Sequence, residues 1–443
     1  MARQTTLEER RQMLELAQAG LTDKAIGQQT GWSERTVQKW RRRGQRQGRA
    51  GLASSMGRPV RGALSTYPEE ISATLRFWRE GHPGWGPKTL RTELEQHPEL
   101  GREKLPAPSS IARFLQEQGL SRRYERHSEL PESEKEPAKA AHEVWEMDAR
   151  GHEYLPDVGV ITLIDLNDRF SHLRLLSYPC WLGQERCQRH ADTTDYQMVL
   201  RLAFSDWGRP QRLQVDRESV FYDNTSKSPF PTRLHLWLLA LGVSLTFGRP
   251  HQATDQGMTE RSHQLWQAQC LQEQHYETWQ ELYLALRRRR DFLNHDLPCS
   301  SLDEQPPLRA FPEAAHSHRP YRPEWEADLL DLTLIYDYLA QGRWFRLASK
   351  HGTFSLGGHV YNAGSHWARQ QLDITFDAAD QQLHCHDEAG QPIKRLPIQG
   401  LTLEALMGDL APFALLPVFQ LALPFAWDSQ RVLRLFEIVG DTT

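Results

Sequence analysis

The chain has 443 residues, a length that corresponds to about two to four domains. Hydrophobic residues make up 39% of it, and no stretch approaches the ~18 apolar residues that span a bilayer. The charged N-terminus lacks the apolar segment of a secretion signal. The five cysteines are scattered and form no CxxC pair, so reduced thiols are expected and a zinc site is not. These features predict a cytoplasmic protein without a membrane partner.

The net charge of −4 hides an asymmetry along the chain. Residues 1–130 contain 23 Lys and Arg against 15 Asp and Glu, whereas the remaining residues contain 30 against 42. A basic front end suits a polyanion such as DNA, although a solvated charged surface would give the same counts. The pattern inside the region therefore has to decide between the two.

Residues 7–43 have the pattern of a helix-turn-helix. Three short helices are expected, and Thr22 and Ser33 are in position to cap the second and the third. Val37 and Trp40 would face the core of this unit. An ordinary helical bundle is the alternative, but the basic third helix favours DNA binding. The side chains that would face outward, toward a major groove, are Arg35, Gln38, Lys39, Arg42 and Arg43.

A second helical unit is expected over residues 67–127, after a flexible linker rich in Gly and Arg. Its helices are predicted over residues 68–80, from Pro87, and after an N-cap at Ser109. Residues 129–141 are polar, contain two prolines and mark a domain boundary. The basic run before this boundary extends the DNA-binding surface through Arg122 and Arg123.

The pattern changes over residues 142–310, where strands and helices alternate. A short strand ends at Asp148, and an antiparallel hairpin follows with its turn near residue 167. After a helix, the next strand ends at Asp216, and one more strand leads to a long helix with Glu260 in its first turns. This order predicts a mixed α/β sheet.

Asp148, Asp216 and Glu260 are all carboxylates that could bind the same metal ions. Carboxylates are the hard oxygen ligands that hold Mg²⁺. Two such ions, roughly 3.5–4 Å apart, can clamp the attacking and leaving oxygens of a phosphodiester. Taken singly, each acid is more often a surface carboxylate or a helix cap, so the surrounding residues have to be considered.

The three acids lie in the segments WEMDARG, RLQVDRESVFYD and GRPHQATDQGMTERSHQLW. Together with ITLIDLNDRFSHL, these segments resemble the DDE superfamily of bacterial insertion-sequence transposases and retroviral integrases. The resemblance covers about residues 5–310. It implies an RNase H-like central fold in which Asp148, Asp216 and Glu260 are catalytic and bind two Mg²⁺ ions, with Mn²⁺ as a substitute. It also implies double-stranded DNA as partner and at least a homodimer, and it leaves open whether a helper ATPase takes part.

Two departures from the family pattern follow Asp216. Arg217 and Glu218 stand where the family commonly has Asn or His followed by Gly. The 43 residues between Asp216 and Glu260 exceed the usual interval, and the excess is expected in the polar loop 223–231. Neither departure removes a ligand.

Several other residues support weaker expectations. His263 would contact phosphate or simply pack, and Arg261 would contact DNA or pair with an acid. Asp165 would orient a neighbour in the site or stabilise a turn. The basic cluster 287–290 would bind DNA or form a solvated helical face.

The C-terminal part follows a linker rich in Pro and His over residues 311–325. Short alternating runs with Gly-containing turns predict a small β-barrel, similar to the C-terminal barrels of phage and insertion-sequence transposases that bind DNA or a neighbouring subunit. Metal binding by the run 384–386 is not favoured, because only its two histidines would share a strand face. The apolar tail would pack on the barrel or on a partner chain.

The sequence thus predicts a multidomain protein: N-terminal all-α helix-turn-helix units, a central α/β RNase H-like catalytic domain and a C-terminal small β-barrel. The expected function is a transposase that binds element ends, cuts their 3′ ends and transfers them to target DNA, in a bacterial cytoplasm and on the nucleoid. A domesticated transposase acting as a sequence-specific regulator, and a nuclease for RNA–DNA hybrids, remain as alternatives. The predicted domains are residues 1–50, 67–127, 142–310 and 329–443.

Overall fold

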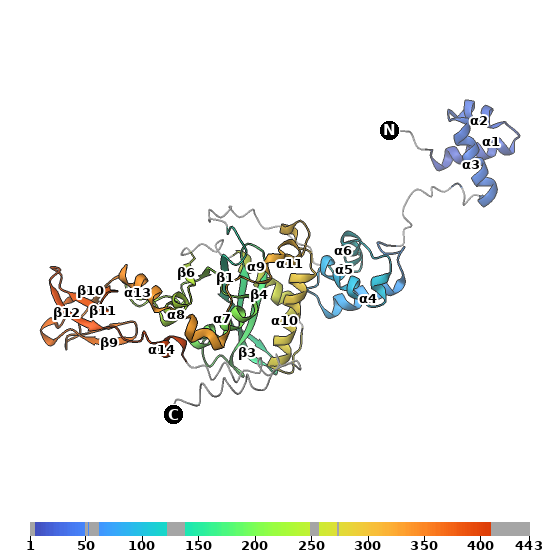
Figure 1. Cartoon of the computed structure of the whole chain (residues 1–443). Helices are drawn as coiled ribbons and strands as arrows, with labels where there is room; N and C mark the ends of the chain where they lie inside the picture. Colours follow the sequence, from blue (N-terminus) through green and yellow to red (C-terminus); the bar gives the residue numbers. More distant parts are fainter. Residues whose placement is uncertain are drawn as a thin grey trace. The chain divides into compact units, whose positions relative to one another are not determined.

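The computed structural model describes residues 5–48, 52, 62–121, 138–248, 257–272 and 274–408. They fall into two compact units, Met1–Glu69 and Glu70–Thr443, each of which is described by itself (Figure 1). Among the described residues, no helix has the length and apolar character needed to span a membrane.

The first unit is a bundle of three helices, as predicted. They are α1 (Leu7–Gln18), α2 (Asp23–Thr30) and α3 (Glu34–Gln47), and the side chains of Thr6, Thr22 and Ser33 cap their N-termini. Gly31 ends α2 in the left-handed conformation (φ 73°), which leaves room for the sharp turn into α3. The buried core consists of Met13, Ile26, Val37 and Trp40.

The second unit begins with the helices α4 (Glu69–Gly81), α5 (Pro87–Gln96) and α6 (Pro108–Glu117), with the 3₁₀ turn η2 (Leu100–Arg102) between the last two. The predicted N-cap at Ser109 is wrong. Helix α6 starts one residue earlier, at Pro108, with Ala107 as an N-cap that makes no side-chain hydrogen bond. Proline has no N–H to satisfy, so it is well suited to this first position. Arg122 and Arg123 lie outside the described residues.

A mixed sheet forms the centre of this unit. Its strands are β1 (Val144–Ala149), β2 (Glu153–Leu155), β3 (Gly159–Asp168), β4 (Arg174–Gly183), β5 (Arg212–Val215) and β6 (Ser244–Phe247). The order is β2-β3-β1-β5-β6, and β4 is a further strand that pairs with β3. Strands β1, β3 and β4 pair antiparallel, whereas β1, β5 and β6 pair parallel. The predicted α/β core is therefore present.

The hairpin turn between β3 and β4 lies slightly later than predicted. Asn167 and Asp168 still belong to β3, and the chain reverses over residues 169–173. The Asp168 carboxylate organises this reversal, because it accepts hydrogen bonds from the backbone N–H groups of His142 and Ser171, both at 2.8 Å.

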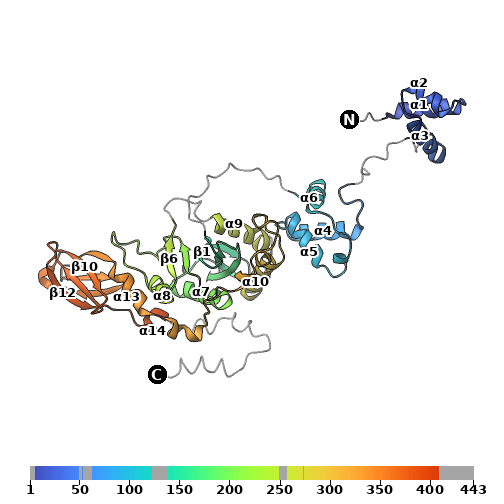
Figure 2. The ribbon, with the colours of Figure 1, turned by 45° about the horizontal axis from the view of Figure 1, so that its top comes forward.

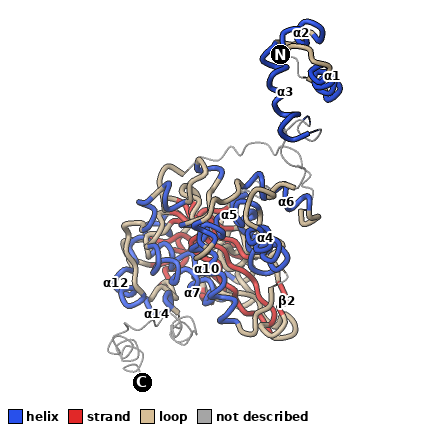
Figure 3. Tube along the Cα trace, turned by 90° about the vertical axis from the view of Figure 1, so that its right-hand side faces the viewer, coloured by secondary structure: helices blue, strands red, loops and turns tan. Residues whose placement is uncertain are grey.

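Helices surround the strands of this sheet (Figures 2 and 3). They are α7 (Thr193–Trp207), α8 (Arg233–Ala240), α9 (Gly257–Trp266) and α10 (Trp279–His295), and the π-helical turn η4 (Gln267–Leu271) follows α9 directly. One core joins Ile164 and Leu166 of β3 to α7 and α8. Another joins Ile161 and Leu163, on the opposite face of β3, to η4 and α10. The faces of β3 therefore alternate with a period of two, as expected for a strand buried on both sides.

The C-terminal part begins with short helical segments: η5 (Ser300–Leu302), α11 (Pro307–Ala310), η6 (Pro312–Ala315), η7 (Pro323–Trp325), α12 (Glu326–Leu329) and α13 (Leu332–Ala340). The strands β7 (Arg343–Leu347), β10 (Gln371–Asp377), β11 (Gln382–His386) and β12 (Pro392–Pro397) then form an antiparallel sheet. A separate hairpin consists of β8 (Thr353–Leu356) and β9 (His359–Asn362). The remaining elements are η8 (Ser365–Trp367) and α14 (Leu403–Met407).

These described strands form two sheets and not the closed barrel that the sequence suggested. The outer edge of β7 is occupied by a loop rather than by another strand, because Phe345 N–H donates to the Ser228 hydroxyl at 3.2 Å. The apolar tail expected to pack on the barrel lies outside the described residues.

Candidate functional site

Helix α3 presents the basic surface that the sequence predicted. Val37 and Trp40 are buried, so the remaining faces of the helix point to solvent. Arg10 covers the Trp40 ring at 4.0 Å and keeps it shielded from water. The predicted DNA-binding residues lie together and line one surface hollow with Arg46: Arg35, Gln38, Lys39, Arg42 and Arg43.

A row of polar side chains crosses the central sheet. In the antiparallel pairing of β1 with β3, Asp148 lies opposite Asp165. In the parallel pairing of β1 with β5, Glu146 lies opposite Gln214. Because side chains alternate along a strand, continuing this register by two residues brings Asp216 beside Asp148 on the same face. Topology therefore brings these three carboxylates to one place.

Asp216 follows β5 directly and lies at the carboxyl end of the parallel strands. Gly248, directly after β6, donates its N–H to the carbonyl of Val215 at 3.1 Å. A Cβ atom at Gly248 would lie 3.3 Å from Asp216 Oδ1, so the small residue permits a close approach here. Sheet order and a neighbouring glycine thus define the position of this acid.

Helix α9 packs on β1 and β3, over the same face of the sheet. Glu260 is in the first turn of α9, and its side chain lies outside the described part of the structure. His263 comes one helical turn later, so the two residues share a face of the helix. The buried Ser262 hydroxyl donates to Asn167 Oδ1 at 2.8 Å and fixes α9 against β3.

His263 lies between two of the carboxylates. Its Nε2 is 3.3 Å from Asp165 Oδ2, and its Nδ1 is 3.8 Å from Asp148 Oδ2. Burial, with a smaller contribution from the charge of Arg150, lowers the pKa of His263 to about 4. Burial raises the pKa of Asp165 to about 7, and the charge of the nearby Asp148 contributes less to this rise. Asp165 therefore contacts the site and takes no part in the turn, which Asp168 stabilises.

A second polar row flanks the first, and the sequence analysis did not identify it. Glu146 and Asn167 are paired in register, and both are buried. Arg169 connects the row, with its Nε 3.6 Å from Glu146 Oε1 and its Nη1 3.2 Å from Gln214 Oε1. Arg174 donates to Asn167 Oδ1 at 3.2 Å. Polar residues at every second position of two otherwise apolar strands are the signal that predicts this row.

Arg217 and Glu218, which depart from the family pattern, are integrated into the loop after β5. The Tyr196 hydroxyl of α7 donates to Glu218 Oε2 at 2.7 Å. The Arg217 guanidinium lies 5.3 Å from the centre of the Tyr222 ring. Asn224 Nδ2 donates to the carbonyl of Arg217 at 2.9 Å. These contacts give the unusual residues a structural role beside Asp216.

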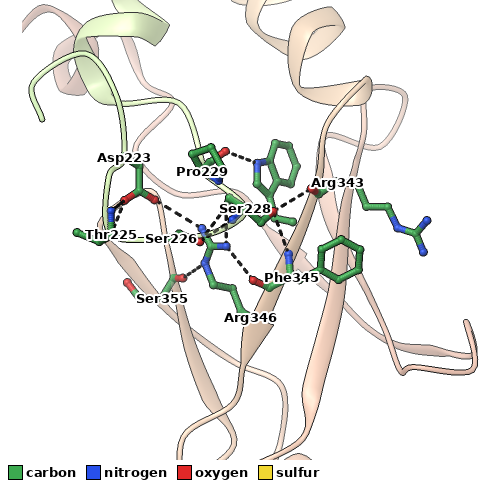
Figure 4. Close-up of polar contacts among 10 residues, drawn as sticks. Asp223, Thr225, Ser226, Ser228, Pro229, Arg343, Phe345, Arg346 and Ser355 are labelled. Carbon is green, nitrogen blue, oxygen red and sulfur yellow. Dashed lines mark hydrogen bonds and ion pairs between the residues drawn. The ribbon is translucent and has the colours of Figure 1, made fainter. Parts of the chain in front are cut away.

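The extra loop 223–231 contacts the C-terminal sheet (Figure 4). The Ser228 hydroxyl donates to the carbonyl of Arg343 at 3.1 Å, and Arg346 Nη1 donates to the carbonyl of Ser228 at 2.8 Å. Trp344 Nε1 donates to the carbonyl of Pro229 at 3.1 Å. The added length between Asp216 and Glu260 therefore joins the central sheet to β7.

The basic cluster 287–290 is divided between the surface and the interior, because Arg288 is exposed whereas its last two arginines are not. Arg289 and Arg290 are buried. Arg289 Nη1 is 2.7 Å from Glu93 Oε1, and Arg290 Nη1 is 3.0 Å from Asp206 Oδ2. Both arginines hold helices together, which the sequence could not distinguish from surface charge.

Residues 4–53 match the model of a Homeodomain-like domain. Solved structures similar to this chain include three viral ones. The HTLV-2 integrase catalytic core domain in complex with magnesium is 13% identical over 39% of this chain and 97% of that chain (TM-score 0.27). A chain of the simian T-cell lymphotropic virus intasome in complex with the PP2A regulatory subunit B56 gamma is 14% identical over 74% and 99% (TM-score 0.31). The BIV integrase catalytic core domain is 15% identical over 40% and 98% (TM-score 0.27).

A domain that matches the Homeodomain-like model precedes an α/β core. In the described sheet of this core, β1, β2 and β4 pair antiparallel with β3, whereas β5 and β6 run parallel to β1. The predicted order of an N-terminal helix-turn-helix and a mixed α/β sheet is therefore confirmed, and the helix-turn-helix supports a role in binding DNA.

Proposed function

We propose that this protein is a DNA transposase that binds element ends, cuts a strand at each end and joins the 3′-hydroxyl to target DNA. The observation that supports it best is the register of β1 with β5, which brings Asp148 beside Asp216 on the sheet face that α9 covers. Glu260 belongs to the first turn of that helix. The catalytic triad of the proposal is therefore Asp148, Asp216 and Glu260.

The donor atoms fit magnesium. Asp148 and Asp216 offer hard carboxylate oxygens at the C-terminal ends of β1 and β5. A close pair of like charges is stable only around a cation. We therefore propose that Asp148, Asp216 and Glu260 hold two Mg²⁺ ions, for which Mn²⁺ can substitute. Bound there, the ions supply positive charge that lowers the pKa of an attacking hydroxyl and stabilises the leaving oxygen.

The chain's own residues prepare this site. His263 is neutral at pH 7 because its pKa is about 4, so it adds no positive charge that would repel a cation. Its ring lies between Asp165 and Asp148 and limits the space open to the Asp148 carboxylate. Arg169 and Arg174 offset the negative charge of the adjacent polar row. The site thus combines fixed carboxylates with a restrained, uncharged neighbour.

The basic face of α3 supplies recognition of the element end. Its exposed Arg and Lys side chains can contact phosphates, and Gln38 can bind a base edge in the major groove. Two element ends have to be held together before joining, so the active form is at least a homodimer. Arg122 and Arg123, in the predicted basic run, would make further phosphate contacts.

The experiment that tests the proposal compares the full chain with its Asp148→Asn variant on labelled element-end duplexes, with Mg²⁺ present. The variant is expected to lose cleavage and joining, because its amide is a poorer cation ligand than a carboxylate, while gel-shift affinity for the ends stays within about twofold. Asp157→Asn is the matched control, since Asp157 is exposed in the turn between β2 and β3 and belongs to neither polar row.

The outcomes separate the alternatives. Full activity of Asp148→Asn would overturn the assignment. A wild-type chain that binds element ends but never cuts them would identify a DNA-binding regulator. A preference for RNA–DNA hybrids over duplex DNA would identify a nuclease of a different kind.

A further inference from the structure

A cluster of two histidines and one cysteine, none of which belongs to the proposed catalytic triad, lies in the segments that follow β1 and β4. His152 is in the segment between β1 and β2, and Cys187 and His190 are in the segment between β4 and α7. Their ligand atoms all lie within 4.8 Å of one another. Cys187 Sγ is 3.9 Å from His152 Nε2, and the two histidine rings are 5.6 Å apart between centroids.

These separations match a tetrahedral metal site. With Zn–S at about 2.3 Å and Zn–N at about 2.0–2.1 Å, a tetrahedral angle requires a sulfur–nitrogen distance of roughly 3.6 Å. The observed 3.9 Å between Cys187 and His152 needs only a small side-chain rotation. A thiolate with two imidazoles is a soft to borderline donor set that suits Zn²⁺ and is poorly matched to Mg²⁺.

The fold holds these ligands in place without help from an ion. Strands β1 and β4 both run antiparallel to β3, so their C-terminal ends lie on the same side of the sheet, at the N-terminal end of β3. The N–H groups of Gln188 and Arg189 donate to the carbonyl of Leu182 at 2.9 and 3.2 Å and fix the turn around Cys187. Arg189 is also paired with Asp195 of α7, with Nη2 2.9 Å from Oδ1. The cluster is thus preorganised, which lowers the entropic cost of binding a cation.

We propose that His152, Cys187 and His190 bind one Zn²⁺ ion, with a water molecule as the fourth ligand. The thiol of Cys187 now donates to the carbonyl of Arg189 at 3.0 Å, and on binding its proton passes to solvent as the thiolate forms. Both histidines are exposed, so the fourth position faces solvent. The sequence argued against zinc because no CxxC pair exists, whereas the fold assembles the ligands from two separate segments.

The ion would connect the segment that contains His152 to the segment that contains Cys187 and His190, and both segments line one cavity. His152 and His190 line a hollow of about 390 Å³ that also includes Arg150, Arg217 and Glu218. Because Arg150 and Arg217 follow the proposed catalytic residues Asp148 and Asp216 closely in the chain, zinc would stiffen the segments around that site. It would take no part in holding the Mg²⁺ ions.

The test is metal binding by the chelator-treated full chain. We expect Co²⁺ to give a thiolate-to-cobalt charge-transfer band with strong four-coordinate ligand-field bands, and about one equivalent of Zn²⁺ to abolish both. Cys187→Ser should lose the charge-transfer band and bind Zn²⁺ at least roughly tenfold more weakly. The His190→Ala variant should also weaken binding, which provides a second measurement if one variant folds poorly.

Cys299→Ser is the matched control, because Cys299 is also partly exposed but lies outside the cluster. It should keep the band, and Asp148→Asn should keep it as well. An unchanged cobalt spectrum in Cys187→Ser would overturn the proposal, and so would a wild-type spectrum that has only weak six-coordinate bands and no charge-transfer band. None of these readouts depends on DNA cleavage, so this inference and the proposed function can fail independently.

Discussion

Arg201 of α7 and Glu326 of α12 form a bidentate ion pair that is shielded from water. The Nε and Nη2 atoms of Arg201 each lie 2.7 Å from a Glu326 oxygen, and the two side chains are 1% and 0% exposed. Glu326 also accepts hydrogen bonds from Trp237 Nε1 at 2.8 Å and from the Tyr321 hydroxyl. Arg201 donates in addition to the carbonyl of Met407 at 2.8 Å. One buried charge pair therefore connects the central helices to the start and the end of the C-terminal part.

Replacing one partner should be costly. The Glu326→Gln variant leaves the buried Arg201 without a counter-charge, and we expect the free energy of unfolding to fall by about 3–5 kcal/mol. Urea denaturation followed by tryptophan fluorescence measures the change. Glu324→Gln, two residues away and exposed, should cost less than about 0.5 kcal/mol. Equal stability of the two variants would show that the buried pair contributes nothing.

The loop between α4 and α5 meets the π-helical turn η4 at Gly84. A Cβ atom at this position would overlap the carbonyl of Ala268. We expect Gly84→Ala to lower the free energy of unfolding by about 1–3 kcal/mol, because the loop between α4 and α5 has to move away from η4. Hydrogen exchange in α4 and α5 should become faster for the same reason. At Gly86 the corresponding space is open, so Gly86→Ala should leave exchange unchanged. Slow exchange in both variants would contradict the close contact.

DNA binding by α3 should depend on single charges. Lys39 is exposed on the basic face, and Lys39→Ala should weaken DNA binding while lowering the slope of log affinity against log salt by about 1. Fluorescence anisotropy with labelled duplex over a salt series gives both values. Lys350→Ala removes the same charge from an exposed turn of the C-terminal part and serves as the control. An unchanged slope in Lys39→Ala would place the phosphate contacts elsewhere.

Stability should fall in acid partly because of His235. This residue is 5% exposed, with Phe247 and Tyr338 as ring neighbours, and burial lowers its pKa to about 4. Between pH 6.5 and 4 the unfolded chain binds a proton that the folded chain does not, so stability declines as pH falls through this window. The loss assignable to His235 is up to about 3 kcal/mol. His235→Phe should flatten the dependence of the urea midpoint on pH, whereas His351→Phe, at an exposed site, should not.

The sequence predicts those parts of the structure that depend on local chemistry. Thr22 and Ser33 identify the starts of α2 and α3, because their side chains accept hydrogen bonds from N–H groups in the first turn that have no partner within the helix. Asp148 and Asp216 are recognisable from strand ends and family segments. The position of Asp165 within the site is different, since it depends on the register of β1 with β3, which no single segment encodes.

Contacts between segments that are distant in the sequence account for the remaining differences between the predicted and the observed structure. Arg289 looks like surface charge until Glu93, almost two hundred residues earlier, becomes its partner. Periodicity indicates the strands β7 to β12 but cannot indicate that the loop containing Ser228 occupies the edge of β7. The same holds for His152 and Cys187, whose spacing along the chain gives no hint of their proximity.

The order in which the ribosome makes these parts has a consequence of its own. The helix-turn-helix has a core of four buried side chains and is synthesised before the central sheet. Asp148 meets Asp216 only after β5 has been synthesised and has paired with β1, a long-range parallel pairing that forms slowly. If the proposed function holds, a nascent chain can hold DNA before it can cut it. Under that proposal, any product that ends before β5 binds DNA without reacting and competes with the longer chain for the same DNA.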